Sequence, residues 1–327
     1  MRRLRDAAEH HQVVLYVAAI MAGAVVGLAA PSAAPALEAA ITPVLGLLLF
    51  VTFLGVPFSH IGRALRDLRF VGSIVIANFV FVPVLVFCLS RFVAHEPALF
   101  VGVLLVLLAP CVDYVIVFAG LAGGSRDRLL AATPLLMVLQ IALLPLLLWW
   151  TAGSDVVAAF EVRPFVAAFV TLIALPLAAA AATQLLARRV PPARRVTEGA
   201  PATMVPLMML TLGIVVASQV SAVSASLLML VSVVPLFAVF PLVAAPTGAW
   251  VARLAGVDTP GRRAAAFSAA TRNSLVILPL ALALPAPYAL APLVVVTQTL
   301  VELIAMVVMV SLVPRFIRDR PGTAYRS

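Results

Sequence analysis

The sequence predicts an all-α polytopic membrane protein whose ten transmembrane helices form a five-plus-five inverted repeat. Hydrophobic residues make up 64% of the 327 residues and the mean hydropathy is +1.17, far above the values of soluble domains. Apolar stretches long enough to cross a bilayer recur along the whole chain. Two of them, 97–122 and 263–284, are interrupted by polar residues at matching places. This pattern predicts discontinuous fourth and ninth helices that cross near the membrane midplane.

Ten apolar runs define the expected spans. In chain order they are 12–30, 39–57, 70–90, 97–122, 129–150, 164–186, 201–220, 225–250, 263–284 and 288–313. Residues 1–327 therefore form a single transmembrane domain, with a first repeat at 12–150, a second at 164–313 and short tails. The arginine-rich connection 187–199 is expected to be the seam between the halves. A signal peptide is an alternative for the first run, but its removal would break the five-plus-five arrangement.

All 22 basic residues are arginines, and their positions predict the orientation of the helices. In the ten-helix arrangement, nearly all of them fall in the two tails and in the connections on the same side as the tails. Only Arg91 and Arg163 lie on the opposite side, and Arg272 lies inside a span. Both termini are therefore expected to be cytoplasmic, in a multi-pass protein of the plasma membrane. The net charge of +9 reflects this topology and does not indicate nucleic-acid binding.

Three charged residues, Asp113, Arg272 and Glu302, lie well inside predicted spans. A charge at the centre of a membrane helix costs roughly 2.5–3.5 kcal/mol on insertion scales, so these side chains must face protein or water. Asp113 and Arg272 lie in the two interruptions, and a crossing there would bring opposite charges together. We therefore expect an Asp113–Arg272 pair. The sequence leaves open whether that pair is structural or takes part directly in substrate binding or gating.

The interruptions themselves contain residues that open a helix. Pro110 has no N–H and clashes with the carbonyl of the preceding turn, so the fourth helix must kink or unwind there. Unwound backbone is tolerated at membrane depth only where it is buried in protein or lines a watery cavity. In the ninth helix, Asn273 and Ser274 could contact a polar solute or could simply hold helices together.

Cys111 follows Pro110 directly and precedes a half-helix, where backbone N–H groups favour a reactive thiol. Cys88 lacks this setting and is expected to pack as a small apolar side chain. The two cysteines have neither disulfide nor zinc-site spacing. No cofactor and no permanent metal are expected.

The last span carries a polar stripe in which Gln298 lies one turn before Glu302. Burial favours the protonated form of a carboxyl group, so Glu302 is a candidate proton carrier. Gln140, on the fifth span, is a candidate lining residue of the same pathway. No hydrolase motif appears, all four histidines lie in termini or loops, and polar residues form no continuous conduit. A carrier fits better than an enzyme or a channel.

The interruption of the fourth span resembles a family signature. The run reads Leu108-Ala109-Pro110-Cys111-Val112-Asp113-Tyr114. It resembles the fourth-helix signature of the Acr3 arsenite efflux family, which belongs to the bile acid/sodium symporter superfamily. The resemblance implies that Cys111 and Glu302 serve arsenite export driven by proton entry, with only transient contact between arsenic and the thiol. Arg272 and Asp113 depart from the family pattern, which indicates a divergent subgroup.

The second interruption also differs from that of the sodium-coupled members of the superfamily. Ser268 and Arg272 stand where the resemblance leads us to expect a glutamate and a glutamine. A fixed guanidinium should repel sodium, so sodium coupling is expected to be absent. The expected partners are therefore arsenite, protons and the lipid bilayer, and the oligomeric state is left open. An organic-anion carrier is the alternative, because Arg272 and half-helix N-termini could attract a carboxylate.

Overall fold

The computed structural model describes residues 12–55, 67–112, 115–153, 170–225 and 227–318, and the regular elements in these ranges are helices. Five helical segments among them are long and apolar enough to cross a membrane. They are Pro31–Leu54, Leu68–Val93, Leu135–Ala152, Leu228–Leu254 and Ala286–Phe316. A bent pair, Pro191–Ala200 and Ala202–Ser218, would be a sixth. The chain is therefore a polytopic helical membrane protein.

The helices follow the expected apolar runs closely. In the first half they are α2 (Gln12–Ala29), α3 (Ala34–Leu54), α5 (Leu68–Ile76), the π-helical turn η3 (Ala77–Phe81), α6 (Val82–Ser90), α7 (Pro97–Leu107), α8 (Val115–Leu121) and α9 (Arg126–Ala152). In the second half they are η5 (Val170–Ala174), α12 (Leu175–Leu186), α13 (Pro191–Ala225), α14 (Leu227–Val231), α15 (Val234–Leu254), α16 (Thr259–Ala270), α17 (Ser274–Leu282) and α18 (Ala291–Phe316). Short 3₁₀ turns, η1 (Pro31–Ala33), η4 (Arg91–Val93) and η6 (Ala286–Tyr288), complete the set.

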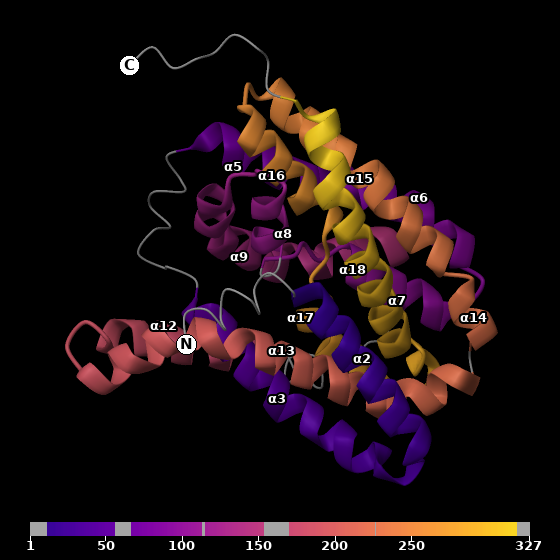
Figure 1. Cartoon of the computed structure of the whole chain (residues 1–327). Coiled ribbons are helices and arrows are strands. Elements are labelled where there is room, and N and C mark those ends of the chain that lie inside the picture. Colours follow the sequence, from indigo (N-terminus) through magenta and orange to yellow (C-terminus); the bar gives the residue numbers. More distant parts are fainter. Residues whose placement is uncertain (1–11, 56–66, 113–114, 154–169, 226, 319–327) are drawn as a thin grey trace.

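The helices form two groups (Figure 1). In the first group, which we call the outer group, α13 packs along α2 and α3, and α12 packs on α3. In the second, which we call the inner group, α15 packs on α5, α16 and α18, α18 also contacts α7 and α17, and α9 contacts α7 and α8. Among the described residues, contacts between the two groups are few and include those of α13 with α18 and of α17 with α3 and η5. The interrupted helices belong to the inner group.

Helix starts in the inner group follow ordinary capping chemistry. The carboxylate of Asp67 accepts a hydrogen bond from the N–H of Phe70 and caps α5, and Asp258 does the same for α16 through Gly261, both at 3.2 Å. Proline occupies the first turn of α7, where its missing N–H is not needed.

Two expectations about the helices need correction or refinement. The connection predicted at 187–199 is largely helical, because α13 already begins at Pro191; proline is compatible with the first turn of a helix. The spans predicted at 97–122 and 263–284 each consist of two helices too short to cross a bilayer alone, which confirms that they are interrupted. Part of the span predicted at 164–186 lies outside the described residues.

Close helix packing holds the inner group together. A β-carbon placed on Gly248 of α15 would lie 2.7 Å from the β-carbon of Ala269 on α16, and one placed on Gly102 of α7 would lie 2.8 Å from that of Val294 on α18. Such distances are shorter than any normal contact, so both helix pairs approach as closely as they do only because glycine is present.

We expect Gly248→Ala to lower the thermal unfolding temperature of the purified protein, because α15 must move away from α16 at an overpacking cost of about 1–3 kcal/mol. Gly46→Ala is the matched control, since a β-carbon there meets no atom within 4 Å. The control should be neutral or slightly stabilising, because alanine favours the helix. An equal decrease in both variants would contradict the packing argument.

Candidate functional site

The two interruptions meet and pair through their backbones. Pro110 and Arg272 form an isolated antiparallel bridge. On either side of it, the N–H of Cys111 donates to the carbonyl of Thr271 at 3.1 Å, and the N–H of Asn273 donates to the carbonyl of Ala109 at 2.8 Å. The two interruptions therefore lie against each other, and each satisfies backbone groups that the other leaves open. We call the paired segments, residues 109–112 and 271–273, the crossing.

The bridge explains why proline is tolerated at its centre. In an antiparallel pair of this type, the N–H groups of the two facing residues point away from the partner segment. Pro110 therefore loses no hydrogen bond of the pair by having no N–H. The N–H of Arg272 is free to point outward, and it donates to Oε2 of Glu302 on α18 at 2.8 Å.

The guanidinium group of Arg272 lies where two half-helices end, and the residue is fully buried. Its Nη2 donates to the carbonyls of Ser268 at 3.0 Å and Ala269 at 2.6 Å, in the last turn of α16. Its Nη1 donates to the carbonyl of Leu107, the last residue of α7, at 3.3 Å. Because the carbonyl end of a helix carries partial negative charge, both half-helices stabilise this cation.

Two residues from neighbouring helices enclose the same guanidinium group. Asn78, in the π-helical turn η3, accepts from Nη2 of Arg272 through Oδ1 at 2.7 Å and donates through Nδ2 to Ser268 Oγ at 3.1 Å. The ring of Phe240 on α15 lies 5.2 Å from the Cζ atom of Arg272, within the range of a cation–π contact. The guanidinium is thus held by oxygen atoms and by one aromatic face.

Glu302 links the crossing to the last helix and is 3% exposed. Its Oε2 accepts from the Arg272 N–H and also from Nε2 of Gln298, one turn earlier on α18. Glu302 thus ties α18 to the crossing.

The fifth predicted span contacts the other side of the crossing. Oε1 of Gln140 on α9 accepts from Nδ2 of Asn273 at 3.4 Å. On the same helix, Oγ1 of Thr133 donates to the carbonyl of Val112 at 3.3 Å. Each interruption is therefore held by a polar residue of a continuous helix.

A narrow cavity lies between the outer group and the α17 and α18 helices of the inner group. Its walls come from α2, α13, α17 and α18, and Ser274 and Thr299 are the hydroxyl-bearing residues among an otherwise aliphatic lining. Its volume of about 10 Å³ holds at most one water molecule. Ser274 Oγ in this wall is buried without a hydrogen-bond partner among the described residues, as is Gln298 Oε1, which does not line the cavity. We call this space the crevice.

Cys111 is 1% exposed and is part of the crossing, whereas Cys88 on α6 is exposed. Asp113 lies outside the described residues, so the expected Asp113–Arg272 pair stays a prediction. Within the described ranges, no group of three His, Cys, Asp or Glu residues could hold a metal ion.

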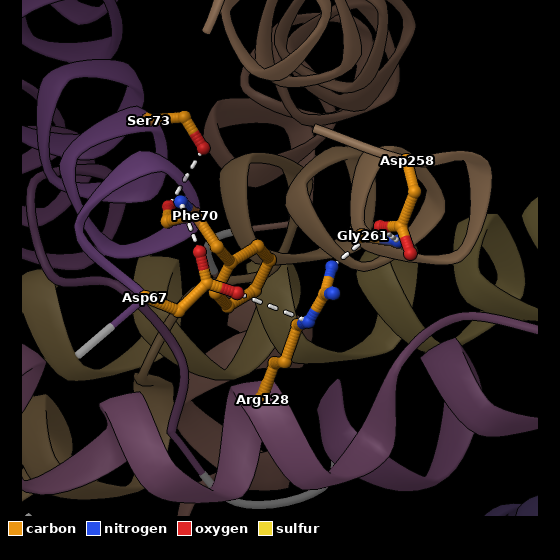
Figure 2. A network of polar contacts seen from close by, with 6 residues as sticks. All are labelled: Asp67, Phe70, Ser73, Arg128, Asp258 and Gly261. Atoms are coloured by element: carbon orange, nitrogen blue, oxygen red, sulfur yellow. Dashed lines mark hydrogen bonds and ion pairs between the residues drawn. The ribbon is translucent and has the colours of Figure 1, made fainter. Parts of the chain in front are cut away.

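A separate polar cluster fixes one end of the inner group (Figure 2). Arg128 of α9 lies between the two capping carboxylates: its Nε is 3.1 Å from Asp67, and its Nη1 contacts Asp258. The starts of α5, α9 and α16, which the arginine pattern places on one side of the membrane, therefore meet at one end of the inner group. Neither Asp67 nor Asp258 was among the residues predicted from the sequence to be functional.

These features define the class of the molecule: a polytopic helical membrane protein in which two interrupted helices cross beside buried polar residues, as in carriers with discontinuous helices. The Sodium Bile acid symporter family model matches residues 42–226, more than half of the chain. The chain belongs to this family, whose members are transporters. The comparison with curated proteins gives no match.

The structure brings most of the predicted residues together. Those in the crossing, or bonded to it directly or through Glu302, are Pro110, Cys111, Gln140, Arg272, Asn273, Gln298 and Glu302. Ser274 belongs to α17 and faces the crevice. Sequence reasoning missed Asn78 and Phe240. A buried asparagine inside an apolar span was the available signal for Asn78, whereas nothing distinguished Phe240 from other aromatic residues.

We expect Asn78→Ala to destabilise the protein by about 1–3 kcal/mol, because it leaves a buried charged donor without its acceptor. Ser73→Ala on the same helical segment is the control, since its buried hydroxyl donates to the carbonyl of Phe70 in its own helix. Thermal unfolding of the purified protein, read from intrinsic fluorescence, compares the two. Similar decreases would show that Asn78 does not stabilise Arg272.

Proposed function

We propose that the chain is a secondary active transporter that exports trivalent arsenic in exchange for protons. The proposal includes the ten-helix inverted repeat. Its support is a constant spacing: the interval from Pro110 to Arg272 equals that from Gln140 to Glu302 and that from Asn78 to Phe240. One constant offset in residue number thus relates three pairs of site residues, as expected if the members of each pair occupy equivalent positions in the two halves.

The observation that carries the proposal is the contact between Glu302 and the backbone of the crossing. When Glu302 is charged, it holds the N–H of Arg272 and ties α18 to the two interruptions. When it is protonated, Oε2 is a weaker acceptor and this tie loosens. Proton binding is thereby coupled to the geometry of the crossing, as an antiporter requires.

The position of the Arg272 guanidinium group argues against sodium coupling. In carriers with discontinuous helices, half-helix C-termini and unwound carbonyls are the groups that coordinate a transported cation. Here the carbonyls of Leu107, Ser268 and Ala269 receive hydrogen bonds from the guanidinium group. The protein's own cation occupies this position, and a sodium ion there would meet a fixed positive charge.

The crevice suits a small neutral solute. Arsenous acid is neutral at neutral pH and both donates and accepts hydrogen bonds through its hydroxyl groups. Ser274 Oγ, in the wall of the crevice, is a buried polar atom that such a solute could engage when the crevice widens. At Cys111, arsenous acid and the thiol would form one As–S bond and release one water molecule; hydrolysis reverses this step. One thiol gives a bond weak enough for release.

The alternative substrate class, an organic anion, depended on attraction of a carboxylate to Arg272. That side chain is fully buried, and Asn78, Phe240 and the helix-end carbonyls surround its guanidinium group. In this arrangement the cation stabilises the crossing. The geometry therefore favours the neutral solute.

The proposal also covers the membrane location and the orientation of the chain. The excess of arginine on one side supports a plasma-membrane protein with both termini in the cytoplasm. The proposed Asp113–Arg272 pair would add a second charged contact to the crossing.

We expect Glu302→Gln and Cys111→Ser each to reduce pH-gradient-driven arsenite uptake into everted vesicles by about tenfold or more, equivalent to about 1.4 kcal/mol. The first removes the titrating group and the second removes the arsenic ligand. Glu198→Gln and Cys88→Ser are matched controls, because both residues are exposed and outside the crossing. Wild-type rates in the first two variants, with comparable amounts of protein, would contradict the proposal.

We expect arsenite transport by the wild-type protein to be unchanged when sodium is replaced by potassium or choline. The reason is that the guanidinium group of Arg272 already occupies the helix-end carbonyls that would coordinate a sodium ion. Proteoliposomes with a fixed pH gradient provide the measurement. Robust sodium-dependent uptake of an organic anion would overturn both the coupling mode and the substrate class.

A further inference from the structure

A second, larger cavity lies on the inner group, on helices α15, α16 and α18. Its volume is about 480 Å³, within the range of roughly 300–1,000 Å³ that is usual for ligand sites. Most of its lining is apolar and includes Pro241, Leu242, Pro246, Trp250, Met309 and Phe316. We call it the α15–α18 groove. It shares no lining residue with the crevice.

The charges of the groove are confined to one end. Arg253, in the last turn of α15, and Arg262, in the first turns of α16, are the two charged residues of its lining. Along α15, Leu242 lies about 17 Å from Arg253, given a rise of about 1.5 Å per residue. The groove is thus an apolar channel with a cationic end, close to the Arg128 cluster of Figure 2 through the start of α16.

The exposed side chains of the groove identify its surroundings. Leu242 is 69% exposed, Trp250 50% and Phe316 79%. In a polytopic membrane protein, large apolar side chains of this kind face lipid, and tryptophan favours the level of the head groups. Basic pockets between helices on the cytoplasmic side are suited to anionic lipid head groups.

The C-terminal tail is a less suitable occupant. Beyond α18 it carries Arg318, Arg320 and Arg326 against Asp319, and it has few apolar residues. Its excess positive charge would be repelled by Arg253 and Arg262. An amphiphile with a negative head and an apolar chain complements both the charged end and the apolar wall.

We propose that the α15–α18 groove binds one anionic phospholipid, with its phosphate at Arg253 and Arg262 and an acyl chain along α15 toward Leu242. The lipid would contact α16, which leads directly into the crossing. It would therefore stabilise the helix whose end holds Arg272.

The test compares the thermal unfolding temperature of the detergent-purified protein with phosphatidylglycerol, phosphatidylcholine or inorganic phosphate. We expect only phosphatidylglycerol to raise it strongly. In the double variant Arg253→Gln/Arg262→Gln, the apparent affinity should fall about 30-fold, at about 1 kcal/mol for each arginine. Arg188→Gln/Arg189→Gln removes the same charge from exposed positions elsewhere and should retain the wild-type response.

Native mass spectrometry of the wild-type protein and of Leu242→Gln provides a second measurement that does not depend on the arginine variants. We expect one retained phosphatidylglycerol in the wild type and weaker retention when the apolar wall becomes polar. Equal stabilisation by phosphatidylcholine or by inorganic phosphate would overturn the proposal. An unchanged response in the Arg253/Arg262 variant would do the same.

Discussion

The backbone pairing of the two interruptions is the constraint on which the rest of the site depends. Unwound backbone inside an apolar bundle leaves N–H and C=O groups that cost free energy unless they are satisfied. Here each interruption satisfies part of the other through the bonds at Cys111 and Asn273. The guanidinium of Arg272 then satisfies carbonyls at the ends of both α7 and α16. Helix breaks that would be unfavourable separately become stable as a pair.

In the proposed inverted repeat, the pairing would make the two halves chemically different at equivalent positions. Pro110 has no N–H to offer a neighbouring helix, whereas Arg272 donates its N–H to Glu302. Gln140 would be the neutral counterpart of Glu302, and it accepts a hydrogen bond from the side chain of Asn273 instead. A titratable group would then contact the crossing from one half, which would give the proposed proton coupling a direction.

Much of the site was accessible from the sequence because its signals are local. A proline followed by polar residues inside an apolar run predicts a break wherever it occurs, and a buried carboxyl group on an apolar helix stands out without a structure. The partners of Arg272 were harder to find, since a guanidinium can reach several helices and the choice depends on packing. Asn78 and Phe240 come from helices that the pattern marked as ordinary spans. The helical start of α13 was missed because a Pro-Pro pair reads as a loop although it also suits a first turn.

The division into two helix groups explains how a buried site can serve transport. Within the inner group, glycine contacts and the polar network of Arg272 tie the helices together, so we expect the crossing to move as a unit in the proposed transport cycle. Between the groups the described contacts are sparse, and the crevice wall is mainly aliphatic. Aliphatic surfaces can slide or separate without breaking directional bonds, whereas the crossing cannot open without losing several. The proposed transport cycle would therefore involve motion along the crevice. Because α18 touches α13 and also carries Glu302, proton binding at that carboxyl group, as proposed above, would act on the surface between the two groups.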